Sequence, residues 1–340
     1  MNIKNFKSIA IALTGIVFSF SSCISTETIE PQNPKEETSS DEIVLNLSAP
    51  KGSKTRADQD HHLRFVAKLF PLKFDGAFEY DKMQRAEILG DKETDNKITF
   101  KVESGKNYKI VVFADYIPDA NKQNDRYKDY YYDTSSTDSS IAMNTTPGTP
   151  GTQFSTAFFN NDNYDCFGGV TGKITKEDQQ IEINLTLERV VAKIQWVDTS
   201  QDPGTLKTFK FDALQYFKGM ELSELMGNDL KTTNYTINAE ELIKSDESLV
   251  FFYTFAQKAT RSLNIGFTTT INENRDPNTV TVEPNYINIQ KNYKTIVKGN
   301  FLAQKSGAVS DNTPSGDAST KDSDEIILHL SFDDEWAGTK

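Results

Sequence analysis

The chain has 340 residues, of which 36% are hydrophobic and 25% charged, so its composition is that of a globular protein with room for two domains. Its 37 Lys and Arg against 49 Asp and Glu give a net charge of −12, which argues against binding to nucleic acid or to anionic lipid head groups. Two cysteines exclude a disulfide-dense scaffold, and three histidines leave little material for His-based catalytic or metal sites. We therefore expect no enzyme activity, no cofactor and no bound metal.

The first 22 residues have the pattern of an export signal. Lys4 and Lys7 precede the apolar run 8–20, which is too short to span a bilayer. Two small serines then lead into Cys23, an arrangement that resembles the lipobox of bacterial lipoproteins, in which the thiol is acylated (palmitate) and becomes the first residue. The alternative is ordinary signal cleavage beside an incidental cysteine. Removing two lysines and no acid takes the net charge from −12 to −14, so the mature chain would be held by lipid rather than by charge.

Beyond the signal, the sequence predicts a tether followed by an all-β body of antiparallel sandwiches. Residues 24–40 have almost no apolar content, whereas the body alternates apolar and polar residues between turns rich in Asn, Asp, Gly and Ser. Two short helices are expected, at 81–89 and 239–243. The polar stretch 121–152 is expected to be a surface loop, and 306–324 a flexible linker. Strands are expected at 43–47, 62–69, 97–103, 108–116, 180–188, 190–197, 249–255, 263–271, 279–289 and 293–301.

One internal match relates the two halves of the chain. Residues 106–112 (KNYKIVV) and 291–297 (KNYKTIV) agree at five of seven positions, and each copy follows an alternating strand across a short turn. Each half is therefore expected to hold an equivalent hairpin, in two related sandwich domains over 58–189 and 190–305 that meet near Arg189. Chance convergence on a turn sequence is the alternative.

A second match relates the two ends of the body. Residues 41–48 (DEIVLNLS) and 324–331 (DEIILHLS) agree at six of eight positions. Alternate residues of a strand share a face, so the two copies would present the same anchors to the same groove. Each copy closing its own domain is the alternative reading. The anchors of the first copy are Ile43, Leu45 and Leu47, and those of the second are Ile326, Leu328, Leu330 and the following Phe332.

The loop after the first copy offers a way to release it. Residues 50–57 are polar and contain Arg56-Ala57, the kind of loop where proteases cut. Cutting there would free the first strand and open a sheet to strand addition. The second copy follows a linker of about 20 residues, which fully extended reaches about 65 Å. It could therefore fill the groove of a neighbouring molecule, and this head-to-tail contact does not close, so it makes a fibre.

These features together resemble the fimbrillin family of Bacteroidota, the major and minor fimbrial subunits. The resemblance rests on Cys23, the tether, the strand and loop with Thr55-Arg56-Ala57, and two β-domains joined through residues 187–193 (LERVVAK). It implies two tandem transthyretin-like β-sandwich domains, export as an outer-membrane lipoprotein precursor, trimming after an arginine by a surface protease, and polymerisation into a fimbrium by C-terminal strand donation. Anchor, tip and non-polymerising lipoproteins of the same family are the alternative.

Carried onto this chain, the resemblance divides it into the signal 1–22, the lipidated tether and removable strand 23–57, the two domains, and the linker with its donor strand 306–340. Cys23 would be acylated and Arg56 would precede the cut, with Arg126 as a rival site. The implied partners are other copies or related subunits, the outer membrane, an arginine-specific surface protease, and a host or glycan ligand.

Four further groups of residues are candidate sites. Tyrosines 127, 130, 131 and 132 could form an adhesive loop for glycan or protein, against packing over the sandwich or a subunit contact. The oxygen-rich run 160–165 suggests calcium but lacks the Gly and distal Glu of an EF-hand loop. His61 and His62 point to opposite faces of a strand start, which disfavours joint metal binding. Cys166 is expected to be a buried thiol beside a turn, and no catalytic motif is present.

Overall fold

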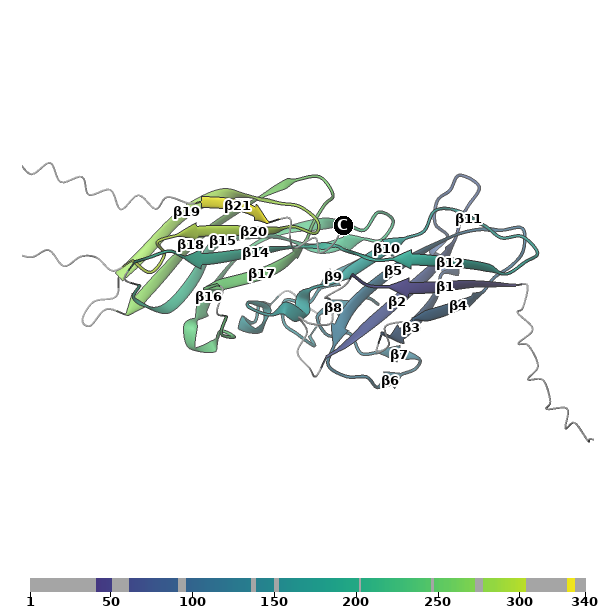
Figure 1. The fold of residues 1–340 in the computed structure, drawn as a ribbon, viewed down its shortest axis with the longest axis horizontal. Coiled ribbons are helices and arrows are strands. Elements are labelled where there is room, and N and C mark those ends of the chain that lie inside the picture. Colours follow the sequence, from purple (N-terminus) through teal and green to yellow (C-terminus); the bar gives the residue numbers. More distant parts are fainter. Residues whose placement is uncertain are drawn as a thin grey trace, which may run out of the picture. The chain divides into compact units, whose positions relative to one another are not determined.

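The computed structural model describes residues 41–50, 61–90, 96–135, 139–149, 153–201, 203–245, 248–272, 278–303 and 329–333. These residues form an all-β structure, as the sequence predicts (Figure 1). Within those ranges the helices are single 3-10 turns, and none is long and apolar enough to cross a membrane. They are η2 (Tyr80–Lys82), η3 (Thr156–Phe158), η4 (Asp162–Tyr164) and η5 (Ala239–Glu241).

The first half of the body is a sandwich of two sheets. One sheet has three strands in the order β12 (Ile181–Thr186), β1 (Glu42–Ser48) and β4 (Lys97–Lys101). The other has the order β13 (Glu188–Arg189), β10 (Phe167–Val170), β5 (Asn107–Ile117), β2 (His62–Pro71) and β3 (Gln84–Leu89), with β11 (Ile174–Thr175) also on β5. Alternate apolar residues of the two sheets meet in one buried cluster, which includes Leu45, Phe65, Ile98 and Val112.

The second half is built from two further sheets. The order in the smaller one is β17 (Val250–Phe255), β14 (Val191–Asp198), β20 (Lys294–Gly299) and β21 (His329–Asp333). The order in the larger one is β19 (Asn278–Ile289), β18 (Arg261–Asn272), β15 (Thr205–Glu221), β9 (Ser140–Met143) and β8 (Tyr132–Asp133), with β16 (Met226–Asn238) also on β15. A separate two-stranded ribbon pairs β6 (Lys122–Gln123) with β7 (Arg126–Tyr127).

The core of the second half is aromatic. The Trp196 indole is fully buried and lies within 6.0 Å, between ring centroids, of the rings of Phe209, Phe211, Phe252 and Phe267. Most of these pairs are tilted or edge-to-face, the geometries that aromatic quadrupoles favour. The alternation of large aromatic residues along β15 and β17 therefore supplies the side chains that hold the two sheets together.

The helix expected at 81–89 is wrong. Only one 3-10 turn, η2, forms there, and Gln84–Leu89 is the strand β3, paired antiparallel with β2 from Arg64 to Leu69. The ladder hydrogen bonds along β2 outweigh the helical propensity of the Gln-Arg-Ala-Glu run. At 239–243 the structure has the single turn η5 rather than an α-helix.

The repeated KNYK sequence does not mark a hairpin in either half. β4 pairs with β1 while β5 pairs with β2, and β19 pairs with β18 while β20 pairs with β14. In both halves the turn before the repeat therefore carries the chain from one sheet to the other. The repeat still marks an equivalent connection, but between sheets rather than within one. The domain boundary near Arg189 stays a prediction.

The polar stretch 121–152 is not the plain surface loop that its composition suggests. Two of its segments form β8 and β9, and β9 adds to the edge of β15 through the pair Met220 and Ile141. Ile141 and Met143 are buried in the aromatic core. A segment that precedes Arg189 thus completes a sheet of the second half.

Candidate functional site: the first strand and its surroundings

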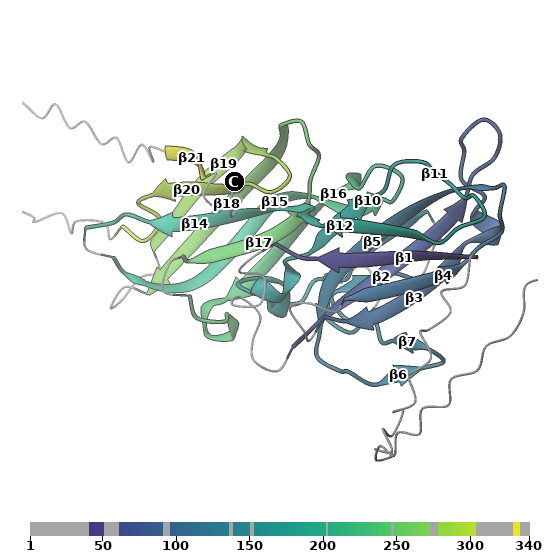
Figure 2. The same cartoon turned by 45° about the vertical axis from the view of Figure 1, so that its right-hand side comes forward.

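The first strand occupies the centre of its sheet. β1 lies between β12, which runs parallel to it, and β4, which runs antiparallel (Figures 1 and 2). Leu45, for example, is opposite Ile183 on one side and Ile98 on the other. Withdrawing β1 would therefore leave a slot with two open ladder edges, whereas withdrawing an edge strand would leave one.

The side chains of β1 are anchored in the core of the first half. Ile43 and Leu45 have no exposed surface and Leu47 is 7% exposed. All three pack with the cluster that fills the sandwich, as the alternation of the sequence predicts. At about 1.5–3 kcal/mol for each buried aliphatic side chain, the three anchors contribute a gross 5–9 kcal/mol to holding the strand.

Polar contacts set the register of β1 on its outer face. Asn46 Nδ2 donates to Asn184 Oδ1 (2.9 Å) and to Glu182 Oε1 (2.8 Å), and Ser48 Oγ donates to Thr186 Oγ1 (3.1 Å). Backbone hydrogen bonds close both ends of the strand, from Val102 N to Asp41 O and from Leu187 N to Ser48 O. These contacts fix which residue of the strand faces which neighbour.

The described part of the second copy, which begins at His329, lies at an edge. β21 pairs antiparallel with β20, with Leu330 opposite Val297 and Phe332 opposite Thr295, at the end of the smaller sheet of the second half (Figures 1 and 2). The side chains of Leu330 and Phe332, together with Cys23, Arg56, Ala57, Ile326 and Leu328, lie outside the part of the structure that is described. The roles predicted for these residues stay predictions.

Two of the four tyrosines expected to form an adhesive loop are buried. Tyr131 and Tyr132 are 4% and 0% exposed and belong to the aromatic core, while Tyr127 and Tyr130 are half-buried. The Tyr132 hydroxyl donates to the Tyr164 carbonyl oxygen, so the ring can be buried without an unpaired polar group. The expectation of an exposed aromatic patch is therefore wrong for Tyr131 and Tyr132, and for Tyr127 and Tyr130 an adhesive role stays a prediction. The outcome matches the alternative, in which the segment packs on the body.

Replacing Tyr132 with Phe is expected to destabilise the protein by about 1–3 kcal/mol, because the Tyr164 carbonyl would be left buried without its donor. Chemical denaturation followed by Trp fluorescence measures this. Tyr80→Phe is the control, since the Tyr80 hydroxyl makes no hydrogen bond with the described residues and the residue is 37% exposed. Equal stabilities of the two variants would contradict the role given to the Tyr132 hydroxyl.

A buried ion cluster lies beneath the same segment. Arg64 on β2 is directly opposite Asp115 on β5 and makes a two-pronged contact with it, from Nε to Oδ1 (2.8 Å) and from Nη2 to Oδ2 (2.7 Å). Arg64 Nη1 also donates to Asp129 Oδ1 at 2.8 Å and lies 3.8 Å from Glu87 Oε2. The Arg64 and Asp115 side chains are completely buried, so each needs the other.

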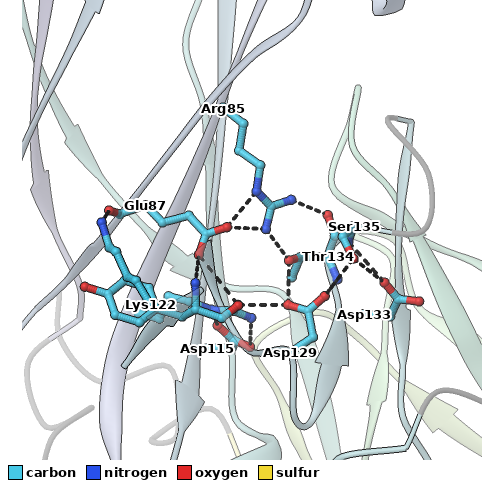
Figure 3. Close-up of polar contacts among 10 residues, drawn as sticks. Arg85, Glu87, Asp115, Lys122, Asp129, Asp133, Thr134 and Ser135 are labelled. Carbon is cyan, nitrogen blue, oxygen red and sulfur yellow. Dashed lines mark hydrogen bonds and ion pairs between the residues drawn. The ribbon is translucent and has the colours of Figure 1, made fainter. Parts of the chain in front are cut away.

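Further hydrogen bonds from Arg85, Glu87 and Asp129 extend the cluster to Thr134, which follows β8, and to β7; Figure 3 shows the side chains of Arg85, Glu87, Asp129 and Thr134. Arg85 Nη2 donates to Thr134 Oγ1 at 2.6 Å, and Asp129 Oδ2 accepts from Thr134 N at 2.9 Å. Glu87 Oε2 accepts from the Tyr127 backbone N–H at 2.9 Å. The cluster thus ties the segment 119–135 to β2, β3 and β5, and its charges are engaged by one another.

Burial and charge oppose each other in the pKa values of this cluster. Burial raises the pKa of Asp115 to about 6, although Arg64 opposes the shift, so this carboxylate is ionised at neutral pH. Burial also acts to raise the pKa of Asp129, but Arg64 and the Thr134 hydrogen bonds lower it overall. Both carboxylates therefore balance the Arg64 guanidinium. The arrangement is that of a structural ion cluster rather than of a catalytic acid and base.

The carboxylates of the oxygen-rich run 160–165 are paired with other side chains of the same chain. Asp162 Oδ1 accepts from Lys193 Nζ (2.8 Å) and from the Tyr253 hydroxyl (2.5 Å), and Asp165 binds Arg189 through both oxygens. Among the described residues no group of three or more His, Cys, Asp and Glu is arranged to hold a metal ion. Asp162 is therefore held by β14 and β17 of the second half, and Asp165 by β13 of the first half.

The two remaining candidates, His61 and Cys166, have contacts or burial typical of structural residues. His61 Nε2 lies 2.9 Å from the Tyr131 hydroxyl, at the start of β2. Cys166 is fully buried, and burial raises the pKa of its thiol well above the usual value, so it is not a nucleophile at neutral pH.

Comparisons with known proteins identify the class of the chain. The family model described as "Family of unknown function (DUF6562)" matches residues 34–340. The chain therefore belongs to the DUF6562 family. No curated protein matches it.

The chain is also similar in structure to solved fimbrial proteins. A fimbrial assembly protein from Parabacteroides distasonis aligns with a TM-score of 0.41 at 12% identity, covering 86% of this chain and 98% of that one. The tip fimbrial protein Mfa3 from Porphyromonas gingivalis gives the same four values. The fimbrial anchor protein Mfa2 from Porphyromonas gingivalis aligns with a TM-score of 0.42 at 10% identity, covering 86% and 97%.

Proposed function

We propose that this protein is a surface fimbrial subunit that polymerises by exchanging its first strand for the C-terminal strand of a neighbour. The observation that carries the proposal is the match between residues 41–48 and 324–331, together with the position of the first copy between two strands. The sequence of β1, which fits between β12 and β4, is thus nearly repeated near the C-terminus of the same chain.

The exchange preserves the contacts of the slot residue by residue. With 324–331 in the place of 41–48, Leu328 takes the position of Leu45, opposite Ile98 and Ile183, and Leu330 takes that of Leu47. On the outer face, His329 replaces Asn46, and a ring N–H can donate to Asn184 as the amide does. Ser331 repeats Ser48, which donates to Thr186.

The C-terminal strand would gain backbone hydrogen bonds by leaving the sheet of its own chain for the slot of a neighbour. Among the described residues β21 makes one ladder, with β20, whereas a strand in the β1 position makes two. The donor would therefore exchange one row of backbone hydrogen bonds for two, and its anchors would enter a core. The Phe332 ring would follow at the position of Ala49, which is half-buried against the same cluster.

The precursor and the polymer are distinguished by trimming. Removal of the signal and acylation of Cys23 would place the precursor in the outer membrane, and a cut after Arg56 would free β1 and the lipid together. A subunit that keeps its lipid would serve as an anchor, and one that loses it as a stalk. Other copies or related subunits would be the partners.

N-terminal sequencing of the protein on the cell surface, alongside its size on a non-boiled gel, tests the proposal. We expect a chain that begins at Ala57, in a ladder of oligomers. Arg56→Ala is expected to keep the acylated N-terminus and run as a monomer, while Arg126→Ala is processed normally. An acylated Cys23 on a lone monomer in the parent protein would contradict polymerisation.

A further inference from the structure

The outer face of the larger sheet in the second half carries uncharged hydrogen-bonding side chains. β16, β15, β18 and β19 lie side by side in that order (Figures 1 and 2). Their inward residues, such as Phe209, Phe267 and Ile287, are buried in the aromatic core. Their outward residues include Thr208, Thr236 and Thr281, so threonine and amide side chains repeat across the four strands.

Register shifts occur at the same level on all three pairs of these strands. Between β15 and β16, Asp212 and Ala213 are opposite the single residue Asn234. Between β15 and β18, Asp212 is an extra residue, and between β18 and β19 two residues, 283 and 284, are opposite Gly266. Such bulges bend a strand and redirect its side chains, and they are enriched next to functional sites.

Directly beside the bulges, one row of side chains crosses the whole face. Thr232 is opposite Gln215, which is followed across the sheet by Asn264 and then by Tyr286. Gln215 Oε1 accepts from the Asn264 backbone N–H at 2.8 Å, so the row is held together by hydrogen bonds. The Tyr286 backbone N–H donates to Asn285 Oδ1 at 2.7 Å.

Tyr286 and Asn264 offer complementary recognition groups at the end of this row. The Tyr286 side chain is 68% exposed. Asn264 Oδ1 is buried and accepts no hydrogen bond from the described residues. Asn288 and Ser262, bonded to each other at 2.6 Å, lie next to the pair. An exposed aromatic face beside amides and hydroxyls fits the apolar C–H face and the hydroxyl groups of a pyranose.

We propose that this row, from Thr232 to Tyr286, is a binding site for a neutral oligosaccharide. The sugar ring stacks on Tyr286, and its hydroxyl groups accept hydrogen bonds from the side-chain amide N–H groups of Asn264 and Gln215, since the Asn264 oxygen is buried and the Gln215 oxygen is already bonded. The four residues of the row carry no charge, and two ion pairs on the same strands, Lys210 with Asp212 and Lys231 with Asp229, each at 2.6 Å, are self-neutralised. The chain as a whole has a net charge of −12, which disfavours an acidic polysaccharide.

Affinity electrophoresis of the full chain in detergent tests this site. The protein is run through native gels that contain xyloglucan, yeast mannan or dextran as neutral probes, and polygalacturonate as the acidic comparison. We expect retardation by at least one neutral polymer. Tyr286→Ala should weaken it at least tenfold, and Tyr286→Trp, which keeps a stacking face, should retain it.

Phe74→Ala is the matched control, because Phe74 is a fully exposed aromatic residue of the first half. It should leave retardation unchanged, and Asn264→Ala should weaken it with an unaltered melting temperature. Retardation that survives in Tyr286→Ala, or that is lost equally in Phe74→Ala, would overturn the site. So would retardation by polygalacturonate alone, or by none of the four polymers.

Discussion

A chain that ends at residue 321 is expected to remain a folded monomer and to form no polymer. Deleting 322–340 removes the edge strand β21 and leaves the other three strands of its sheet, β17, β14 and β20, paired as before. The donor anchors lost with it supply a gross 5–12 kcal/mol at about 1.5–3 kcal/mol for each buried side chain. Size-exclusion chromatography and non-boiled gels measure assembly, and circular dichroism measures folding.

Single substitutions in the donor strand test whether assembly needs the anchor side chains or only the presence of the C-terminal segment. Strand alternation places Leu330 on the anchor face, whereas Ser331 is exposed. Leu330→Asp is therefore expected to abolish polymers as the deletion does, because it would place a charge in the core of the neighbour. Leu330→Met, which keeps an apolar anchor of similar volume, is the control and should polymerise. Normal polymers from the truncated chain would refute strand donation by this segment.

Replacing Arg64 with Met is expected to destabilise the protein by about 3–5 kcal/mol, the usual result of removing one partner from a buried ion pair. Asp115 and Asp129 would lose the guanidinium that balances them, and the Asp115 side chain has no exposed surface through which water could compensate. Urea denaturation at neutral pH measures the change in the free energy of unfolding.

The matched control for Arg64 is Lys82→Met, which breaks the exposed pair between Lys82 and Glu79. The Lys82 side chain is 59% exposed, and water screens such a pair, so its loss should leave the stability almost unchanged. Combining Arg64→Met with Asp115→Leu should restore part of the stability, because the buried carboxylate is removed as well. A loss below about 1 kcal/mol in Arg64→Met would show that the cluster is not a structural element.

Local patterns predicted the parts of this fold that depend on one strand at a time. The alternation of Ile43, Leu45 and Leu47 correctly placed all three on a buried face. The run 81–89 was assigned to a helix because nothing within it records that β2 lies alongside. The tyrosines around 130–132 were misplaced because their Asp and Ser neighbours made the segment look polar, whereas the hydroxyl of Tyr132 finds a backbone acceptor 32 residues away.

The sequence alone does not predict which residues from distant segments are in contact. Arg64 and Asp115 are 51 residues apart, and only the pairing of β2 with β5 makes them neighbours. The row ending at Tyr286 joins four strands through three shifted registers, which no periodicity in a single strand reveals. For such sites the available signal is a charged residue inside an otherwise apolar strand, as with Arg64 between Leu63 and Phe65.

The mixed surroundings of β1 also give the proposed assembly a direction. Because β12 runs parallel to β1 and β4 antiparallel, the two ladders require different spacings of hydrogen bonds. A strand inserted backwards would meet a parallel pattern where the slot offers an antiparallel one, and the reverse on the other side. Every subunit would then join in the same orientation. A filament would therefore have two chemically different ends, one with an unfilled β1 slot and the other with an unpaired donor strand.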